Sequence, residues 1–461
     1  MSLQRQTFSR VTRDPRLQAQ LCLRACAMAP LELYILTFNC ARNLISPHVL
    51  GPHLFDALPK AKPLPDLIAL SLQEVAPIAY SFLGGSLLTP YLDRIGHALR
   101  AAVKCREAEA EVHYQLVVAR NVGLTALVVF AKPDVVKRVR WLQTAGVGVG
   151  LWEMGNKGAV GVRLCLSSDE DSQEEMELTL VSAHFAPFEE YLLRRNQDWE
   201  NIVRHLVFSS DEGPKRITGQ DREGDDTQPL LPDPTKEEPK LGGLFKSGNH
   251  IFFAGDLNYR TSNKGPGPSD YLSFPQPVDA DSPQHFLTWL QRDQLSQERN
   301  AKRTLHGLEE LSVSFPPTYK YSHASAGTPA KRVINSNGLD GAEPDQWAWS
   351  RHRYPSWCDR ILFAPSHGLQ PHIYTSLPVL PTSDHRPVAL SVTVPAKSAG
   401  NIFEAPFPIN PDWRSRRASA RRRELIVGLL AYLSLTREGN SIVVGLIAGT
   451  LVGWFLIKSL I

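Results

Sequence analysis

A run of bulky apolar residues at 251–253 is followed at once by Gly255, Asp256 and Asn258. The run predicts a buried strand, and the glycine permits a bend after it. Asp256 and Asn258 are two positions apart, so on extended backbone their side chains lie on the same face. Burying a carboxylate and an amide there is unfavourable unless they bind something polar. Taken alone, the motif fits a polar strand-to-turn junction equally well.

Other predicted strands also end in polar residues. Apolar segments at 31–40, 67–74 and 178–184 predict strands, and two more lead from 357 to 363 and from 388 to 394. A single polar residue at such an end is usually part of a turn. Eight of them together favour one site at an edge of the sheet. They are Asn39, Glu74, His184, Asp256, Asn258, Asp359, Asp384 and His385.

The predicted elements interleave. Further strands are expected at 112–119, 123–131 and 159–166, with helices at 91–105, 189–208 and 283–311. Segments 209–248 and 324–343 have the composition of disordered insertions, and 1–27 that of a loose N-terminal extension. The pattern predicts an α+β domain over about 28–397, with sheet layers covered by helices.

Composition excludes several classes of protein. The net charge of +3 over 461 residues is too small for a chain-wide nucleic-acid-binding surface. The six cysteines are scattered without a CxxC pair, which favours free thiols over a disulfide framework or a zinc site.

The strand-end residues suggest metal-assisted phosphoester hydrolysis without a covalent intermediate. Glu74, Asp384 and Asn39 offer the oxygen donors that Mg²⁺ prefers. Asp256 could hold or deprotonate a water, with Asn258 fixing its orientation. His385 with Asp359, and secondarily His184, could face a phosphoryl oxygen as charged imidazoles. Positive charge around the site would come from Lys157, Lys320, Arg351, Arg353 and Arg360.

The motifs at 253–260, 353–362, 155–158, 317–321 and 383–387 resemble those of the inositol-polyphosphate 5-phosphatases. This resemblance, within the endonuclease/exonuclease/phosphatase superfamily, implies a four-layer α/β sandwich: two packed, mainly antiparallel sheets flanked by helices. It is strongest to fungal tail-anchored members of the endoplasmic reticulum.

The resemblance also implies roles. Glu74 with Asn39 would form the Mg²⁺ site, Asp256 would position water with support from Asn258, and His385 with Asp359 would stabilise the phosphoryl group. Residues 123–130 resemble a region that directs apolar residues toward lipid. The substrate-binding set would be Asn156, Lys157, Tyr319, Lys320, Arg351, Arg353 and Arg360. The chain departs from the family pattern at two positions, where Ser182 replaces an asparagine and Phe188 replaces a histidine. The loss of that histidine makes a lipid headgroup a better expected substrate than soluble inositol phosphates.

The C-terminal tail predicts a membrane anchor. A basic linker at 398–424 contains six arginines between 414 and 423, and a short apolar stretch follows at 425–435. Residues 441–461 are apolar almost throughout and are about long enough to cross a bilayer. Arginines on the N-terminal side predict a cytosolic domain and could attract anionic lipid. Whether 425–435 lies on the membrane surface or forms half of a hairpin is left open by the sequence.

The expected protein is therefore a monomeric, tail-anchored, Mg²⁺-dependent enzyme of the endoplasmic reticulum that removes the 5-phosphate of phosphatidylinositol 4,5-bisphosphate. One alternative is another phosphodiesterase of the same superfamily, such as a nuclease or a sphingomyelinase. Another is an inactive phosphoinositide-binding tether, which would predict loss of Glu74, Asp256 or His385, and all three are present.

Overall fold

The structure is a computed structural model that describes residues 28–107, 112–168, 174–209, 242–322, 330–334, 340–344, 346–396 and 404–460. The predicted N-terminal extension at 1–27 and residues 210–241 of the predicted insertion lie outside the described residues. Residues 242–248 were assigned to that insertion, but they belong to the folded domain, because Leu244 is fully buried.

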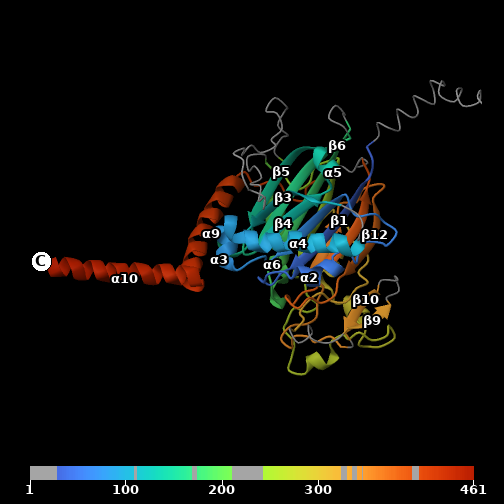
Figure 1. Cartoon of the computed structure of the whole chain (residues 1–461). Coiled ribbons are helices and arrows are strands. Elements are labelled where there is room, and N and C mark those ends of the chain that lie inside the picture. The colour runs from blue at the N-terminus through green and yellow to red at the C-terminus, as the bar shows by residue number, and fades with distance from the viewer. Residues whose placement is uncertain are drawn as a thin grey trace, which may run out of the picture.

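Two sheets form the centre of the domain (Figure 1). The first has the order β12-β13-β1-β2-β4-β3 and the second the order β11-β8-β7-β6-β5. The strands of the first sheet are β1 (Leu31–Asn39), β2 (Leu67–Gln73), β3 (Gln115–Val122), β4 (Thr125–Ala131), β12 (Gln370–Ser376) and β13 (Val388–Val394). Those of the second are β5 (Val139–Gly148), β6 (Gly158–Ser167), β7 (Glu175–His184), β8 (Asn249–Asp256) and β11 (Asp359–Phe363).

The strands pair in a mainly antiparallel manner. The exceptions among the described strands are β1 with β2 and β7 with β8, which are parallel. Because parallel neighbours end at the same edge, Asn39 lies opposite Gln73 and His184 lies opposite Asp256. This arrangement brings several strand-end side chains to one edge of the sandwich.

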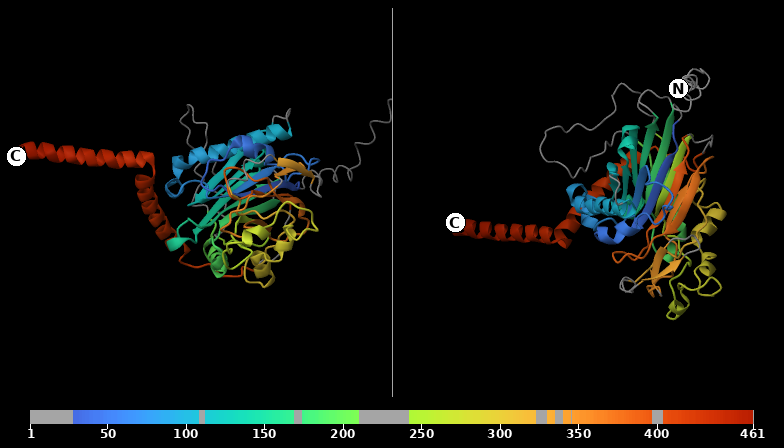
Figure 2. Two further views of the ribbon diagram at one scale, coloured as in Figure 1. Left: turned by 90° about the horizontal axis from the view of Figure 1, so that it is seen from below. Right: turned by 45° about the vertical axis from the view of Figure 1, so that its right-hand side comes forward.

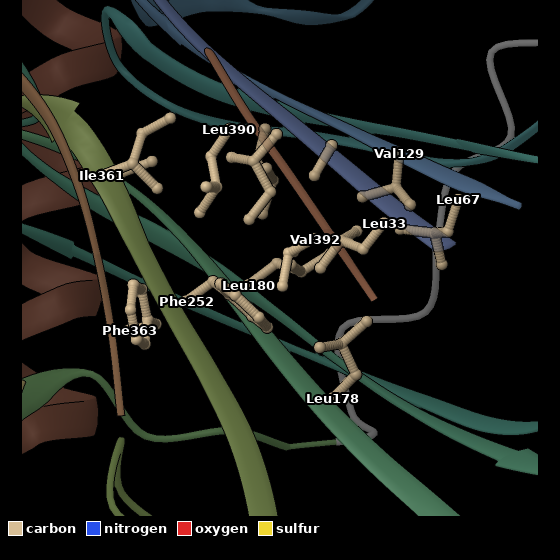
Figure 3. Packing of buried hydrophobic residues seen from close by; sticks show 14 of the residues in the cluster. Leu33, Leu67, Val129, Leu178, Leu180, Phe252, Ile361, Phe363, Leu390 and Val392 are labelled. Carbon is tan, nitrogen blue, oxygen red and sulfur yellow. The ribbon is translucent and has the colours of Figure 1, made fainter. Parts of the chain in front are cut away.

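The main core fills the space between the two sheets (Figure 3). Leu33 and Val392 come from the first sheet, and Leu180 and Phe252 from the second, and all four are buried. Alternate residues on these strands face outward into separate clusters under the helices. Both faces of each sheet are therefore apolar, which explains why the strands appear as continuous apolar runs in the sequence.

Helices complete the four layers, as the views in Figure 2 show. The outer face of the first sheet packs against α2 (Pro47–Leu50) and α4 (Thr89–Arg106). The second sheet packs against α6 (Leu192–His205) and α8 (Gln294–Asn300). The shorter helices are α3 (Ile78–Leu83), α5 (Pro133–Lys137) and α7 (Leu287–Leu290). The predicted four-layer α/β sandwich is confirmed.

The structure differs from several local expectations. Segment 283–311 is not mostly helical: only α7 and α8 form, and Lys302, Leu305 and Gly307 have left-handed backbone that ends helical continuation. Strands β5 and β12 were not predicted. The predicted flexible segment 324–343 contains a two-stranded hairpin, β9 (Ala330–Ile334) with β10 (Asp340–Pro344).

Two long helices end the described chain, α9 (Trp413–Leu435) and α10 (Arg437–Leu460). The arginine-rich part of the predicted basic linker at 398–424 is helical from Trp413 onward. Helix α9 lies against α3, whereas α10 extends away from the domain (Figure 1). Helix α10 is long and apolar enough to cross a membrane. Its most apolar stretch is not buried by the rest of the described structure.

Candidate active site

A cavity of about 160 Å³ opens where β1, β2, β7 and β8 end. Its walls carry carboxylates, amides, imidazoles and cationic side chains within a few ångströms of one another. The residues that line it are Asn39, Ala41, Arg42, Glu74, Lys157, His184, Pro187, Asp256, Asn258, Arg260, Tyr319, Lys320, Asp384 and His385. The cavity thus gathers most of the polar strand-end residues that the sequence singles out.

Asp256 lies at the centre of the site and is almost completely buried. Its Oδ2 accepts a hydrogen bond from Asn39 Nδ2 at 2.9 Å and lies 3.3 Å from His184 Nε2. Its Oδ1 accepts the Asn258 backbone N–H at 3.1 Å. Burial alone would raise the pKa of Asp256, but the charge of His385 and the hydrogen bond with His184 hold it well below its usual range. The carboxylate is therefore ionised at neutral pH.

His385 and Asp359 form a buried pair beside Asp256. The distance from His385 Nδ1 to Asp359 Oδ2 is 2.8 Å, and His385 Nε2 lies 4.0 Å from Asp256 Oδ2. Thr318 Oγ1 donates to the same Asp359 oxygen at 2.7 Å. Burial opposes protonation of His385, but Asp359 and Asp256 outweigh it and raise the pKa of His385 to about 9. This imidazole is a cation at neutral pH.

Glu74 and Asn39 present oxygen atoms to the same cavity. Glu74 follows β2 with a left-handed backbone (φ 46°), and its carboxylate lies 3.0 Å from Arg42 Nε and 4.0 Å from Lys157 Nζ. Asn39 gives its amide N–H to Asp256 and keeps Oδ1 for the Ala41 N–H. A carboxylate and an amide oxygen beside a second carboxylate are donors that suit Mg²⁺. The residues present therefore fit the predicted metal.

A second set of potential ligands consists of Asp256, Asp359 and His385, whose ligand atoms lie within 4.8 Å of one another. His385 Nδ1 is already bonded to Asp359, and the raised pKa keeps the ring protonated. A protonated imidazole cannot bind a metal. We therefore interpret this cluster as a charged pair facing substrate, and Glu74 with Asn39 as the better metal donors.

Cationic and aromatic side chains surround the remaining wall. Lys157 Nζ contacts His184 Nε2, and burial lowers the pKa of Lys157 despite the nearby Asp256 and Glu74 carboxylates. Lys320 Nζ lies 2.7 Å from Asp384 Oδ2. Asp384 is thus paired with a lysine, as Glu74 is paired with Arg42 and Lys157.

Four expected substrate-binding residues are absent from the cavity wall: Asn156, Arg351, Arg353 and Arg360. Arg360 is buried, with its guanidinium 2.9 Å from Asp293 and 2.7 Å from Glu310, so it stabilises the fold. Arg351 is exposed, over the ring of Tyr271. Asn156 lies beside Gly150, and its Oδ1 is buried without a hydrogen-bond partner among the described residues.

Arg353 occupies an intermediate position near the site. Its Nη1 lies 3.0 Å from a fully buried Glu189 carboxylate, and its guanidinium lies 4.9 Å from the ring of Phe188. Phe188 is one of the two departures from the family pattern. It lies outside the cavity wall, next to Pro187, which lines it. The other departure, Ser182, is buried, and its Oγ accepts a hydrogen bond from Ser71 at 2.8 Å.

Residues 123–130 do not reach toward lipid as the resemblance implied. Leu124 and every residue of β4 are buried in the domain. Exposed apolar side chains lie instead at Leu151 and Trp152, between β5 and β6.

The sequence interpretation missed three participants. Arg42 and Arg260 line the cavity, and Thr318 holds Asp359. Arg260 is buried, donates to the Asn258 backbone oxygen at 3.0 Å and lies 4.3 Å from the ring centre of Tyr319. The sequence signal that could have identified Arg260 was its position two residues after Asn258, in a strongly polar motif.

The fold has solved relatives. A structure of the inositol polyphosphate 5-phosphatase domain of SpSynaptojanin, in complex with inositol (1,4)-bisphosphate and calcium ion, matches with a TM-score of 0.54. That match covers 90% of this chain and 96% of the other at 18% identity.

Curated relatives are similar in sequence. Phosphatidylinositol 3,4,5-trisphosphate 5-phosphatase 2B of Danio rerio is 28% identical over 60% of this chain and 18% of its own length. Type II inositol polyphosphate 5-phosphatase 15 of Arabidopsis thaliana is 29% identical over 53% of this chain and 20% of its own length. The chain thus matches about a fifth of the length of these relatives.

The model of the endonuclease/exonuclease/phosphatase family 2 matches residues 36–391, which is most of the chain. The matched segment contains every residue of the cavity wall. The chain therefore belongs to this family, with inositol polyphosphate 5-phosphatases among its homologues.

Proposed function

We propose that this chain is a Mg²⁺-dependent phosphatase that removes the 5-phosphate of phosphatidylinositol 4,5-bisphosphate in a membrane. The proposal rests on the residues that surround Asp256. An ionised carboxylate lies between a charged His385–Asp359 pair and the oxygen donors Glu74 and Asn39. Such an arrangement suits attack of water on a phosphate monoester.

Each group has a distinct task in this proposal. Because its pKa is low, Asp256 does not readily take up a proton. Its role is therefore to accept a hydrogen bond from the attacking water and orient it. Asn39 and the Asn258 backbone fix the carboxylate for that purpose. Charged His385 faces the phosphoryl oxygens, with Asp359 holding its ring. When bound at Glu74 and Asn39, Mg²⁺ supplies positive charge that polarises the phosphate.

Recognition of a neighbouring 4-phosphate is assigned to the cationic wall. Lys157, Lys320 and Tyr319 line the cavity, and the charge of Arg353 acts on Lys320. Lysine and arginine are suited to phosphate oxygens. A second phosphate on the inositol ring would thus meet positive charge next to the reacting one.

The proposed setting is a membrane, with the domain cytosolic and the enzyme monomeric. Helix α10 supports the membrane setting because it is long and apolar enough to span a bilayer and is left unburied by the domain. The arginines of α9 lie before it, on the side expected to stay in the cytosol. The endoplasmic reticulum is proposed on the resemblance to tail-anchored family members alone.

The test is phosphate release from a panel of phosphoinositides and soluble inositol phosphates, with Mg²⁺, by the full chain in mixed micelles. We expect phosphatidylinositol 4,5-bisphosphate to be the best substrate and Asp256→Asn to lower turnover at least a thousandfold. Asp134→Asn, the same change at an exposed site on α5, is the matched control. Full turnover by Asp256→Asn would rule out the assigned role, and release of a different phosphate would reject the substrate.

A further inference from the structure

Helix α9 does more than connect the domain to α10: it contacts a loop of the active site. Glu424 is a buried carboxylate in an otherwise basic stretch, and its Oε1 accepts the Gly155 backbone N–H at 2.8 Å. Its Oε2 lies 3.1 Å from Arg421 Nη1, and Arg421 in turn donates to the backbone oxygen of Leu83 at 3.3 Å. One turn of α9 is thereby bonded both to the 155–158 loop and to the end of α3.

Gly155 is linked to two cavity residues, to Lys157 along the chain and to Glu74 through a series of backbone hydrogen bonds. Lys157 follows it by two positions. The Gly155 carbonyl accepts the Leu124 N–H at 2.9 Å, and the Leu124 carbonyl accepts the Val75 N–H at 3.2 Å. Val75 is the neighbour of Glu74. A short series of backbone hydrogen bonds therefore links Glu424 on α9 to the proposed metal donor and to a cavity lysine.

The packing around these bonds is close. A Cβ at Gly155 would lie 2.7 Å from the Gly123 nitrogen. A Cβ at Gly428, one turn after Glu424, would lie 2.9 Å from Phe82 Cβ. Val427 packs against a small cluster of Phe82, Leu124 and Met154. The close contact of Gly428 with α3 thus helps to set the docked position of α9.

We propose that Glu424 is a positioning residue, through which docked α9 holds Lys157 and Glu74 in their working arrangement. The tail is then a part of the catalytic site as well as a membrane anchor. This inference rests on the proposed function for its kinetic consequences. Its physical claim, that α9 sets the geometry of the metal donor, can be measured without turnover.

The first test compares Glu424→Ala with Glu424→Gln in the full chain in detergent. Alanine removes the acceptor for the Gly155 N–H, whereas glutamine keeps an oxygen there. We expect the alanine variant to bind Mn²⁺, followed by electron paramagnetic resonance, roughly tenfold more weakly and to lose roughly tenfold in kcat. Glutamine should restore both to within about twofold. Glu438→Gln, at an exposed site on α10, is the control for the lost charge.

The second test displaces the helix without touching Glu424. Gly428→Ala places a methyl group against α3, and Gly445→Ala makes the same change on α10, where nothing lies within 4 Å. Both changes favour helix formation equally. We expect only Gly428→Ala to weaken Mn²⁺ binding and lower kcat.

The outcomes are distinct. A lower melting temperature in Glu424→Ala with unchanged Mn²⁺ affinity and kcat would mean a merely structural contact and would overturn the inference. If Glu424→Ala does not fold, Gly428→Ala decides, and its wild-type Mn²⁺ affinity would likewise overturn it. A wild-type chain that binds Mn²⁺ but releases no phosphate from any substrate would reject the proposed function, while the Mn²⁺ comparison still tests the role of α9.

Discussion

Asn39 donates a hydrogen bond of 2.9 Å to Asp256, although 217 positions separate the two residues in the chain. Asn39 ends β1 in one sheet and Asp256 ends β8 in the other. The bond therefore joins the two halves of the sandwich at the point where the proposed chemistry takes place. Both side chains are buried, and both residues line the cavity.

Asn39→Ala should lower kcat roughly 10- to 100-fold, because a hydrogen bond to a charged group contributes about 1.5–3 kcal/mol. The metal donor at Oδ1 is lost in the same change. Asn43→Ala, which removes an exposed amide contact to Thr382, is the matched control. Steady-state kinetics on short-chain lipid measure both. Equal kcat for the two variants would contradict the assigned importance of the bond.

Phosphate release should decline above about pH 9, because His385 must be protonated to face the phosphoryl group. Its pKa is raised from 6.5 to about 9 in the folded protein. The charge also stabilises the fold: this contribution is fully present below pH 6.5 and is lost as pH rises through about 9. The measurements are kcat/KM and melting temperature against pH. An alkaline limb that persists unchanged in His385→Gln would show that another group causes it.

Removal of divalent ions with a chelator should abolish phosphate release, and added Mg²⁺ should restore it. Glu74→Gln should raise the Mg²⁺ concentration for half-maximal activity at least tenfold, because a neutral amide replaces the anionic donor. Glu190→Gln, at an exposed site before α6, should leave it unchanged. The assignment of Glu74 to the metal fails if both variants have the same Mg²⁺ requirement.

Arg360→Met should destabilise the protein without changing KM. The substitution removes the guanidinium beside the buried Asp293 carboxylate and leaves Glu310 with only the Arg299 guanidinium, at 3.4 Å. Breaking a buried pair of this kind costs about 3–5 kcal/mol. Arg292→Met, at an exposed position, supplies the comparison. Urea unfolding measures the free energy of unfolding. A raised KM with full stability would return Arg360 to the substrate-binding set.

A chain that stops after Thr436 should leave membranes and remain active on short-chain lipid. The truncation removes α10 but keeps α9 and its contacts with α3 and Gly155. Sedimentation of cell membranes measures the location of the protein, and a chain with α10 replaced by an unrelated apolar helix serves as control. A truncated chain that still sediments with membranes would count against α10 as the anchor.

Sheet layers covered by helices could be predicted because most strands are buried on both faces and end in polar groups, whereas the four-layer sandwich followed from the family resemblance. Periodicity located most strands within a few residues, including β1, β2, β7 and β8. Segment 283–311 was wrongly predicted as mostly helical because its apolar residues recur at helical spacing. Its left-handed residues Lys302 and Leu305, neither of them glycine, carry no local signal of a helix end.

The site residues at strand ends could be predicted from the sequence. The cationic side chains around the site could be predicted less well. Arg360 follows Asp359 in a motif rich in site residues, yet neighbours on a strand point to opposite faces. Asp359 therefore reaches the cavity side while Arg360 reaches Asp293. The partnership of Glu424 with Gly155 spans 269 positions. No spacing rule connects a lone glutamate in a basic helix to a loop so distant in the chain.

Thr436 is the one non-helical residue between α9 and α10, and its hydroxyl caps α10 by accepting the Gly439 N–H at 3.0 Å. Gly439 itself fits so closely against the Tyr432 carbonyl that no side chain could replace its hydrogen. Because the connection between α9 and α10 is a single residue, the domain can move only a short distance from α10. With α10 in a bilayer, an enzyme so tethered would process lipids beside its own anchor and would be unable to reach across to an apposed membrane.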